Sequence, residues 1–355
     1  MSALTRLTDR LGTLGLPALL VSDITNVQWL TGFTGSSGFV VLTPTRAVFV
    51  TDGRYDTQAH EEVKGFEMVI YKPPMTLDGC LASVFADVGI KTIGFEDLVT
   101  CSTINRLRKA HPGIEFVETA DAVHPLRMVK EPWEVAKIVE ACRLSEACLE
   151  HSLRLLQPGV TEREVAIDIR FYFERQGTVA SFGPIVASGP NSAKPHAKVS
   201  DRVLQKGDFV TIDWGCWLDG YSSDITRTFV IGEASDRHKE VYNAVLDSLL
   251  ESTQALVPGN TGKAVDSVAR DLLSGRGLGH YFTHGLGHGL GRAVHDPGSL
   301  SQASTFTVAE GNVYTVEPGV YIDGFGGVRI EDDVHVTTEG PVVLTRYPRE
   351  LMVVG

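Results

Sequence analysis

Residues 208–231, DFVTIDWGCWLDGYSSDITRTFVI, predict a β-hairpin, because two apolar, β-branched runs flank a turn near Leu218 and Asp219. Asp213 and Asp224 lie equally far from that turn, on strands that otherwise look buried. Residues at equal distances from a hairpin turn are cross-strand partners whose side chains share a face. We therefore expect these two carboxylates to face one another.

A second hairpin is predicted over residues 312–336, NVYTVEPGVYIDGFGGVRIEDDVHV, with its turn near Gly324. Glu317 and Glu331 are equally distant from Gly324 and form a second opposed pair. Like charges on facing positions destabilise a sheet, and an uncompensated buried ion is more costly still. The four acids therefore predict a bound cation.

An L-x-P-G-x-T motif precedes each hairpin, beginning at Leu156 and again at Leu256. In each copy the Pro-Gly pair ends one helix and a threonine, Thr161 or Thr261, is placed to cap the next. Glu164 completes a capping box in the first copy. The repeat predicts two helix–helix–hairpin halves with pseudo-two-fold symmetry, whose hairpins form one curved sheet.

The first part of the chain alternates between helix and strand patterns and predicts a small α/β domain over residues 1–125. A helix is expected over residues 3–15, and the expected strands are PALLVS, GFVVL, AVFVT, FEMVIY and TIGFE. Pro125 is expected to close this domain, and Pro132 to lie in the first turn of a long helix that runs to about Leu156. The second domain is therefore assigned to residues 130–355, and a chain of 355 residues suits two domains.

Composition excludes several classes of partner. The net charge of −12 and the pI near 5.4 argue against nucleic acid, which is bound by clustered Lys and Arg. Neither a signal peptide nor a membrane span is indicated, so no membrane partner is expected. The five cysteines are scattered and form no C-x-x-C, which predicts a reducing cytoplasm.

The segment HGLGHGLG, residues 284–291, holds two histidines among four glycines. So many glycines disfavour a helix. In an extended chain His284, Leu286 and His288 would share a face, and both imidazoles would point into one site. The segment lacks the pattern of a phosphate loop, and the chain contains neither H-E-x-x-H nor G-x-S-x-G.

Four acids with one nearby histidine make an oxygen-rich ligand set with a single nitrogen. Such a set suits two divalent ions, Mn²⁺ first and Co²⁺ or Zn²⁺ after it. Shared carboxylates would hold the ions about 3.5 Å apart, as in many two-metal hydrolases.

The contexts DWGCWLDGYSSDITRTF, HGLGHGLGRAVH, TVEPGVY and GVRIED resemble those of the pita-bread metallopeptidases. Within them the chain is most similar to the Xaa-Pro peptidases, prolidase and aminopeptidase P. The resemblance is specific from about residue 130 onward and looser before it, where TDGRYDTQA and overall size carry it. It implies an α/β N-terminal domain of the creatinase type and an α+β pita-bread catalytic domain.

The resemblance also implies a ligand set for two ions. Asp213 would chelate one ion, Asp224 and Glu331 would bridge, and His288 with Glu317 would complete the other.

The remaining pocket residues are likewise assigned by resemblance. His196, His284 and His295 would line the substrate pocket, with Tyr321 and Arg329 in support. His284 and His295 would stabilise the oxyanion, and Glu317 would carry a proton towards the leaving nitrogen.

Two positions depart from the family pattern: Asp296 stands where Glu is usual, and Asn312 where EGMV is usual. Neither position is a predicted metal ligand, so we expect the two differences to affect substrate preference more than the hydrolytic reaction.

The implied function is an exopeptidase that hydrolyses the Xaa-Pro bond of short proline-containing peptides, in a homodimer. Three alternatives differ in their sequence requirements. A non-catalytic peptide-binding module and a metal-free creatine hydrolase on the same fold should lack the acids. Methionine aminopeptidase should lack the N-terminal domain.

Substrate length depends on an arginine that reads the carboxylate after proline. Prolidases typically supply it between the pocket histidine and TVEPG, but no Lys or Arg occurs between Arg292 and Arg329. Arg292, Arg46 or Arg54 could substitute, in which case the chain would be a strict Xaa-Pro dipeptidase. Without a reader, the sequence favours an aminopeptidase P-like enzyme that accepts Xaa-Pro-Zaa.

Overall fold

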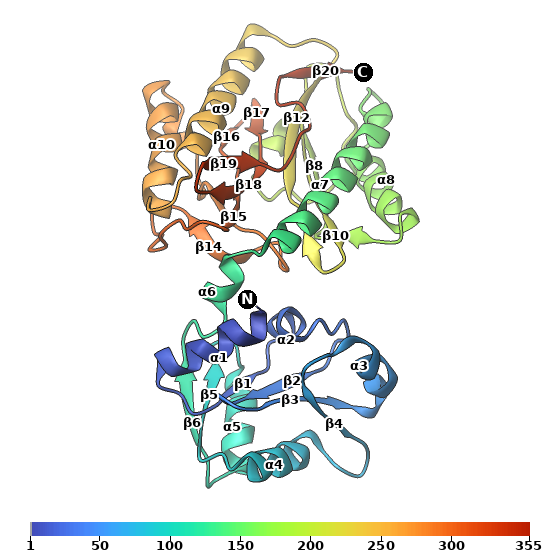
Figure 1. The fold of residues 1–355 in the computed structure, drawn as a ribbon. Helices are drawn as coiled ribbons and strands as arrows, with labels where there is room; N and C mark the ends of the chain where they lie inside the picture. Colours follow the sequence, from blue (N-terminus) through green and yellow to red (C-terminus); the bar gives the residue numbers. More distant parts are fainter. Residues whose placement is uncertain (1) are drawn as a thin grey trace. The chain divides into compact units, whose positions relative to one another are not determined.

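A computed structural model describes residues 2–355 and divides after Arg127 into two compact units (Figure 1). Over the described residues, no helix combines the length and the apolar character needed to cross a bilayer. All five cysteines are free thiols.

The N-terminal unit is a six-stranded mixed sheet in the order β4-β3-β2-β1-β5-β6, with helices on both faces. Side chains alternate across β1: Leu19 and Val21 pack with residues of α1 to α3, and Leu20 packs with residues of α4 and α5. The elements are α1 (Ala3–Leu14), β1 (Leu19–Val21), α2 (Ile24–Thr31), β2 (Phe39–Leu42), β3 (Ala47–Asp52), α3 (Asp56–Glu62), β4 (Glu67–Tyr71), α4 (Leu77–Val88), β5 (Thr92–Glu96), α5 (Cys101–Ala110) and β6 (Glu115–Thr119). The short α6 (His124–Met128) follows.

The C-terminal unit has two halves of similar plan, each a helix pair followed by strands (Figure 1, green to red). The first half comprises α7 (Pro132–Ser152), α8 (Glu162–Arg175), β7 (Val179–Ala180), β8 (Ile185–Ser188), β9 (Phe209–Trp214), β10 (Cys216–Leu218), β11 (Tyr221–Ser222) and β12 (Ile225–Ile231). The second comprises α9 (Asp236–Gln254), α10 (Gly262–Gly275), β13 (Gly287–Gly289), β14 (Asp296–Leu300), β15 (Val313–Val316), β16 (Gly319–Ile322), β17 (Gly326–Arg329), β18 (Asp332–Thr337) and β19 (Gly340–Val343), and β20 (Met352–Val354) returns to β12.

The repeated motif forms the same joint twice. Thr161 accepts the backbone N–H of Glu164 at the start of α8, with the predicted capping box, and Thr261 accepts that of Ala264 at the start of α10. Each half has its own apolar core beneath its helix pair. The unit therefore has the pita-bread architecture with pseudo-two-fold symmetry.

The register of the first hairpin differs from the prediction by one residue at the turn. Leu218 pairs with Tyr221, so the turn is Asp219–Gly220, and Asp213 lies opposite Thr226 and not opposite Asp224. Asp219 and Gly220 have φ of 50° and 84°, the left-handed pair that a two-residue hairpin loop requires and that Asp-Gly favours. Asp224 is consequently a diagonal neighbour of Asp213, two residues from Thr226 along the chain.

The second hairpin has the predicted register. Gly319 pairs with Arg329, and Val316 pairs with Asp332, which puts Glu317 and Glu331 at opposing positions. The prediction of one curved sheet was wrong, because the strands of the two hairpins belong to separate ladders. The hairpins are joined instead by single bonds, such as the one from the Glu331 N–H to the Thr226 carbonyl, 3.1 Å.

Three local predictions also needed correction. Strand β6 was not foreseen, since EFVET reads as mostly polar. Pro125 lies inside α6 and does not end the unit, because the first turn of a helix tolerates proline. The long helix α7 ends at Ser152 and continues only as a 3-10 turn.

Candidate metal centre and substrate cavity

The five predicted metal ligands come from both halves and line one cavity of about 660 Å³. Asp213 is on β9 and Asp224 immediately precedes β12; His288 is the central residue of β13; Glu317 follows β15, and Glu331 precedes β18. The two halves thus meet where their acids converge, which is why neither hairpin alone makes the site.

Ligand atoms of Asp224, His288 and Glu331 all lie within 4.8 Å of one another. His288 Nε2 is 3.6 Å from Asp224 Oδ2 and 3.5 Å from Glu317 Oε1. Asp213 lines the same cavity and accepts a 2.7 Å hydrogen bond from Arg329. The arrangement places four carboxylates and one imidazole around a common space.

The orientation of His288 suits a metal ligand. Its Nδ1 lies 3.0 Å from the carbonyl oxygen of Gly289. Because a carbonyl can only accept, Nδ1 carries the hydrogen and Nε2 turns its lone pair towards the acids. Burial also lowers the pKa of His288 to about 4, so the ring is neutral at pH 7.

Without a cation, the ionised forms of these acids are energetically unfavourable. Burial raises the pKa of Asp224 and of Glu331 well above the usual range, and the neighbouring carboxylates raise them further. Burial raises the pKa of Glu317 to about 8, although Arg329 opposes the shift. Burial and mutual repulsion thus favour the protonated forms of these acids, and a bound cation would stabilise the ionised forms.

Two buried oxygens in the cluster have no hydrogen-bond partner among the described residues: Oδ1 of Asp213 and Oδ1 of Asp224. A buried carboxylate oxygen without a partner is costly. Both belong to predicted ligands, and oxygen is the donor that hard divalent cations prefer. The residues present therefore fit a group of divalent ions.

Neighbouring side chains hold the ligands in place. Thr226 Oγ1 donates to Glu331 at 2.7 Å, and Thr315 Oγ1 donates to Glu317 at 3.3 Å. Arg329, in the cavity wall, donates a hydrogen bond to Asp213 and another, of 2.8 Å, to the Tyr321 hydroxyl. Such outer contacts fix the orientation of ligands.

The three predicted pocket histidines, His196, His284 and His295, all line the cavity. The His295 ring packs edge-on against His288, with ring centres 4.2 Å apart. His284 Nε2 lies 2.9 Å from the Tyr321 hydroxyl. Tyr321 itself is behind this wall, and it reaches the cavity only through His284 and Arg329.

Both ring nitrogens of His284 are already engaged. Nδ1 lies 2.7 Å from the Gly285 carbonyl and must carry the hydrogen, so Nε2 accepts from Tyr321. Burial lowers the pKa of His284 to about 4, which keeps the ring neutral. In this state His284 has no N–H left for an oxyanion. Leu286, expected on the same face, packs instead into the core of the second half, since residues 284–286 precede the strand and its alternation.

Sequence reasoning missed parts of the site. Asp333 is fully buried and accepts the Asp224 backbone N–H at 3.1 Å and the Cys142 thiol at 3.3 Å. The doubled acid in EDDVHV, on an otherwise apolar strand, was the available signal. Phe182 and Ile185 also line the cavity, and no sequence motif indicated that they would.

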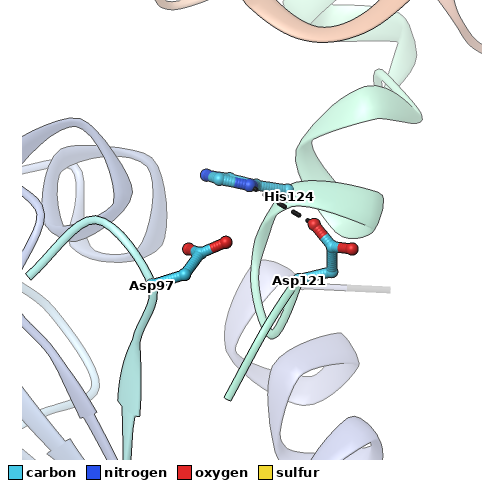
Figure 2. Close-up of side chains that lie close together, drawn as sticks. All are labelled: Asp97, Asp121 and His124. Atoms are coloured by element: carbon cyan, nitrogen blue, oxygen red, sulfur yellow. Dashed lines mark ion pairs between the residues drawn. The ribbon is translucent and has the colours of Figure 1, made fainter. Parts of the chain in front are cut away.

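A second group of possible ligands lies in the N-terminal unit: Asp97, Asp121 and His124 (Figure 2). Asp97 and Asp121 are exposed to solvent, and His124 Nδ1 lies 3.6 Å from Asp121 Oδ1. Water can stabilise these charges, so the group has no need of an ion.

Two family models match the chain. Residues 136–338 match the model of metallopeptidase family M24, and residues 4–129 match the creatinase/prolidase N-terminal domain. A peptidase of Bacillus subtilis is 40% identical over 99% of both chains. The Xaa-Pro dipeptidase of Pyrococcus horikoshii is 34% identical over 95% of both chains.

Solved structures give the same result. The Xaa-Pro dipeptidase from Bacillus anthracis has a TM-score of 0.95 at 39% identity, covering 99% of both chains. The X-Pro aminopeptidase from Thermotoga maritima has a TM-score of 0.91 at 35% identity, covering 100% of both chains. The chain therefore belongs to metallopeptidase family M24 and carries a creatinase/prolidase N-terminal domain.

Proposed function

We propose that this protein hydrolyses the Xaa-Pro bond at the N-terminus of short peptides with two divalent cations. The observation that carries the proposal is the group of five ligands, buried or partly buried, with two oxygens that lack a partner among the described residues, open to a 660 Å³ cavity. The similarity to the Xaa-Pro dipeptidase of P. horikoshii supports the proline specificity. A binding module or a metal-free hydrolase would have no use for these ligands.

Mn²⁺ is the expected ion, with Co²⁺ or Zn²⁺ as substitutes, because the set is oxygen-rich with one nitrogen. Asp213 would hold one ion, and His288 and Glu317 would hold the other. Asp224 and Glu331 would each help to hold both ions. Bound divalent cations supply Lewis acidity and lower the pKa of an attacking water.

The side chains divide the remaining work. Water attacks the scissile carbonyl carbon, and the C–N bond to proline breaks. Glu317 carries the proton of the water to the leaving proline nitrogen. Because His284 has no free N–H, we assign stabilisation of the developing oxyanion to His295, while the Tyr321 hydroxyl holds the His284 ring in the cavity wall. His196 contacts the substrate from the loop that follows β8.

For substrate length we propose that longer peptides are accepted. The described residues that line the cavity include a single arginine, Arg329, whose charge Asp213 already neutralises. Arg292 lies outside this lining, with its guanidinium 5.0 Å from the centre of the Tyr221 ring. The cavity lining therefore offers no unpaired arginine to bind a substrate carboxylate directly after proline.

The other two arginines considered for binding the substrate carboxylate are in the N-terminal unit, and both already form ion pairs with acidic side chains. Arg46 pairs with Glu67 and Asp87, and Arg54 pairs with Asp52.

The test compares kcat/KM for matched Ala-Pro and Ala-Pro-Ala with added Mn²⁺, and for Ala-Ala-Ala as the proline control. We expect the tripeptide to be cleaved at least as well as the dipeptide, and Ala-Ala-Ala poorly. Cleavage of Ala-Pro alone would establish the second candidate, a strict dipeptidase. No cleavage of either proline peptide by metal-loaded protein would refute the proposal. The expected homodimer is checked by light scattering.

A further inference from the structure

All three pocket histidines lie outside the β-strands: His295 directly precedes β14, and the other two lie on loops. His196 follows the 3-10 turn η3 (Gly189–Ala193), and His284 precedes β13. Ladder hydrogen bonds therefore do not fix either backbone, yet both imidazoles line the cavity. Their position depends on contacts from elsewhere in the unit.

In the first half, that contact is Glu162, the first residue of α8, which has no exposed surface. Its carboxylate accepts from the backbone N–H groups of Ser188, 2.8 Å, and Ser200, 3.1 Å. It also accepts from both serine hydroxyls and from the Asn191 amide. The donors thus come from both ends of the loop that carries His196.

In the second half, Asp266 on α10 is also fully buried, about one turn further into its helix than Glu162 is in α8. It accepts the Leu286 N–H at 3.0 Å and pairs with Arg270 at 2.6 Å. Arg270 in turn donates to the carbonyl oxygens of Phe282, 3.0 Å, and His284. Acid and guanidinium together enclose the backbone on both sides of His284.

Neither acid is among the residues that line the cavity, so neither touches a bound substrate. A fully buried carboxylate is tolerated only when several donors satisfy it. Here the donors include loop backbone N–H groups, two for Glu162 and one for Asp266, so the acid and the loop conformation stabilise each other. Loss of the acid would leave these N–H groups without their partner, and the loop would have to move to satisfy them.

We propose that Glu162 and Asp266 are positioning residues, each of which holds the loop that carries one histidine of the cavity wall, His196 or His284. The catalytic consequence rests on the proposed function, whereas the restraint on the loops does not. The two halves of the unit would then use the same device, a buried acid on the second helix, for the two sides of the cavity.

The first test measures loop restraint by hydrogen exchange in the full-length, metal-loaded protein. Glu162→Gln should speed exchange in residues 189–200 and leave residues 282–290 unchanged, and Asp266→Asn should do the reverse. The matched controls are Glu174→Gln and Asp271→Asn, exposed acids on the same two helices. Unchanged exchange in the assigned loop, or equal increases in both loops, would overturn the proposal.

The second test is a double-mutant cycle on peptide hydrolysis. Glu162→Gln should lower kcat/KM by about 10- to 100-fold at unchanged metal content, since small misplacement of a substrate contact has effects of this size. In a His196→Ala background the same change should cost less than about twofold, because the residue acts through His196. An equal loss in both backgrounds would show a merely structural role.

If Glu162→Gln does not fold, Ser200→Ala removes one donor to the same carboxylate and takes its place in the cycle. If wild-type protein cleaves no proline peptide, the proposed function fails, and hydrogen exchange still decides whether the acids anchor the loops.

Discussion

The chain contains two groupings of the same chemical kind, two aspartates or glutamates with one histidine, in opposite environments. In the Asp224, His288 and Glu331 group both acids are buried, and one carboxylate oxygen has no partner among the described residues. In the group of Asp97 and Asp121 with His124, both acids face water (Figure 2). Ligand type and spacing are therefore insufficient to define a metal site. Desolvation makes the difference, because it raises the free energy of the ionised acids until a cation is the best available partner.

The largest expected effect follows from removing a shared ligand in the buried group. Asp224→Asn or Glu331→Gln should lower kcat/KM by more than about 10³-fold, because each of these side chains would help to hold both ions. This loss is larger than the one caused by removing a single oxyanion donor. Elemental analysis should show less bound metal. Full metal content with surviving turnover would contradict the two-metal assignment.

A smaller loss is expected from a pocket residue that is not a ligand. His295→Ala should lower kcat by about 10²-fold with metal content unchanged, because it removes a transition-state partner. Elemental analysis and steady-state kinetics on the same preparation test this. Loss of metal would make His295 a ligand, and a near-normal kcat would remove it from the mechanism.

The pH dependence of metal binding sharpens the comparison further. Glu317 has a pKa near 8 in the metal-free fold, above its unfolded value, so its proton stabilises that fold at low pH. Between about pH 6.5 and 8, above the titration of unfolded histidine, the metal-free protein should lose stability as pH rises. Mn²⁺ binding at pH 7 should release protons, measured by calorimetry in buffers of different ionisation enthalpy. Binding without proton release would show that the acids are already ionised.

The smallest effect is expected in the exposed group. Asp121→Asn should change the free energy of unfolding by less than about 0.5 kcal/mol and leave metal content and turnover unchanged. Asparagine tolerates the left-handed backbone at this position, where φ is 56°, so the change tests charge and not strain. Denaturant unfolding and elemental analysis provide the measurements, and loss of one metal equivalent would mean that the exposed group also binds an ion.

Local sequence chemistry determined much of this protein. The caps at Thr161 and Thr261, the two hairpins and the register of the second one depend on residues close together in the chain. Such features are governed by hydrogen bonds and turn conformations of a few residues, which the sequence encodes directly. The five candidate ligands were also proposed from sequence, because acids on buried strands need a compensating charge wherever those strands pack.

Only the tertiary structure decided how these pieces combine. The left-handed Asp219–Gly220 turn shifted Asp224 from partner to diagonal neighbour of Asp213, yet packing of the halves still brought both to one cavity. Asp333 beneath Asp224, and Glu162 beneath the His196 loop, are joined to their partners by contacts between distant segments. The burial that separates the metal group from the exposed group at Asp97 is likewise a property of the folded chain. Desolvation depends on everything that surrounds a side chain, and no local pattern contains that information.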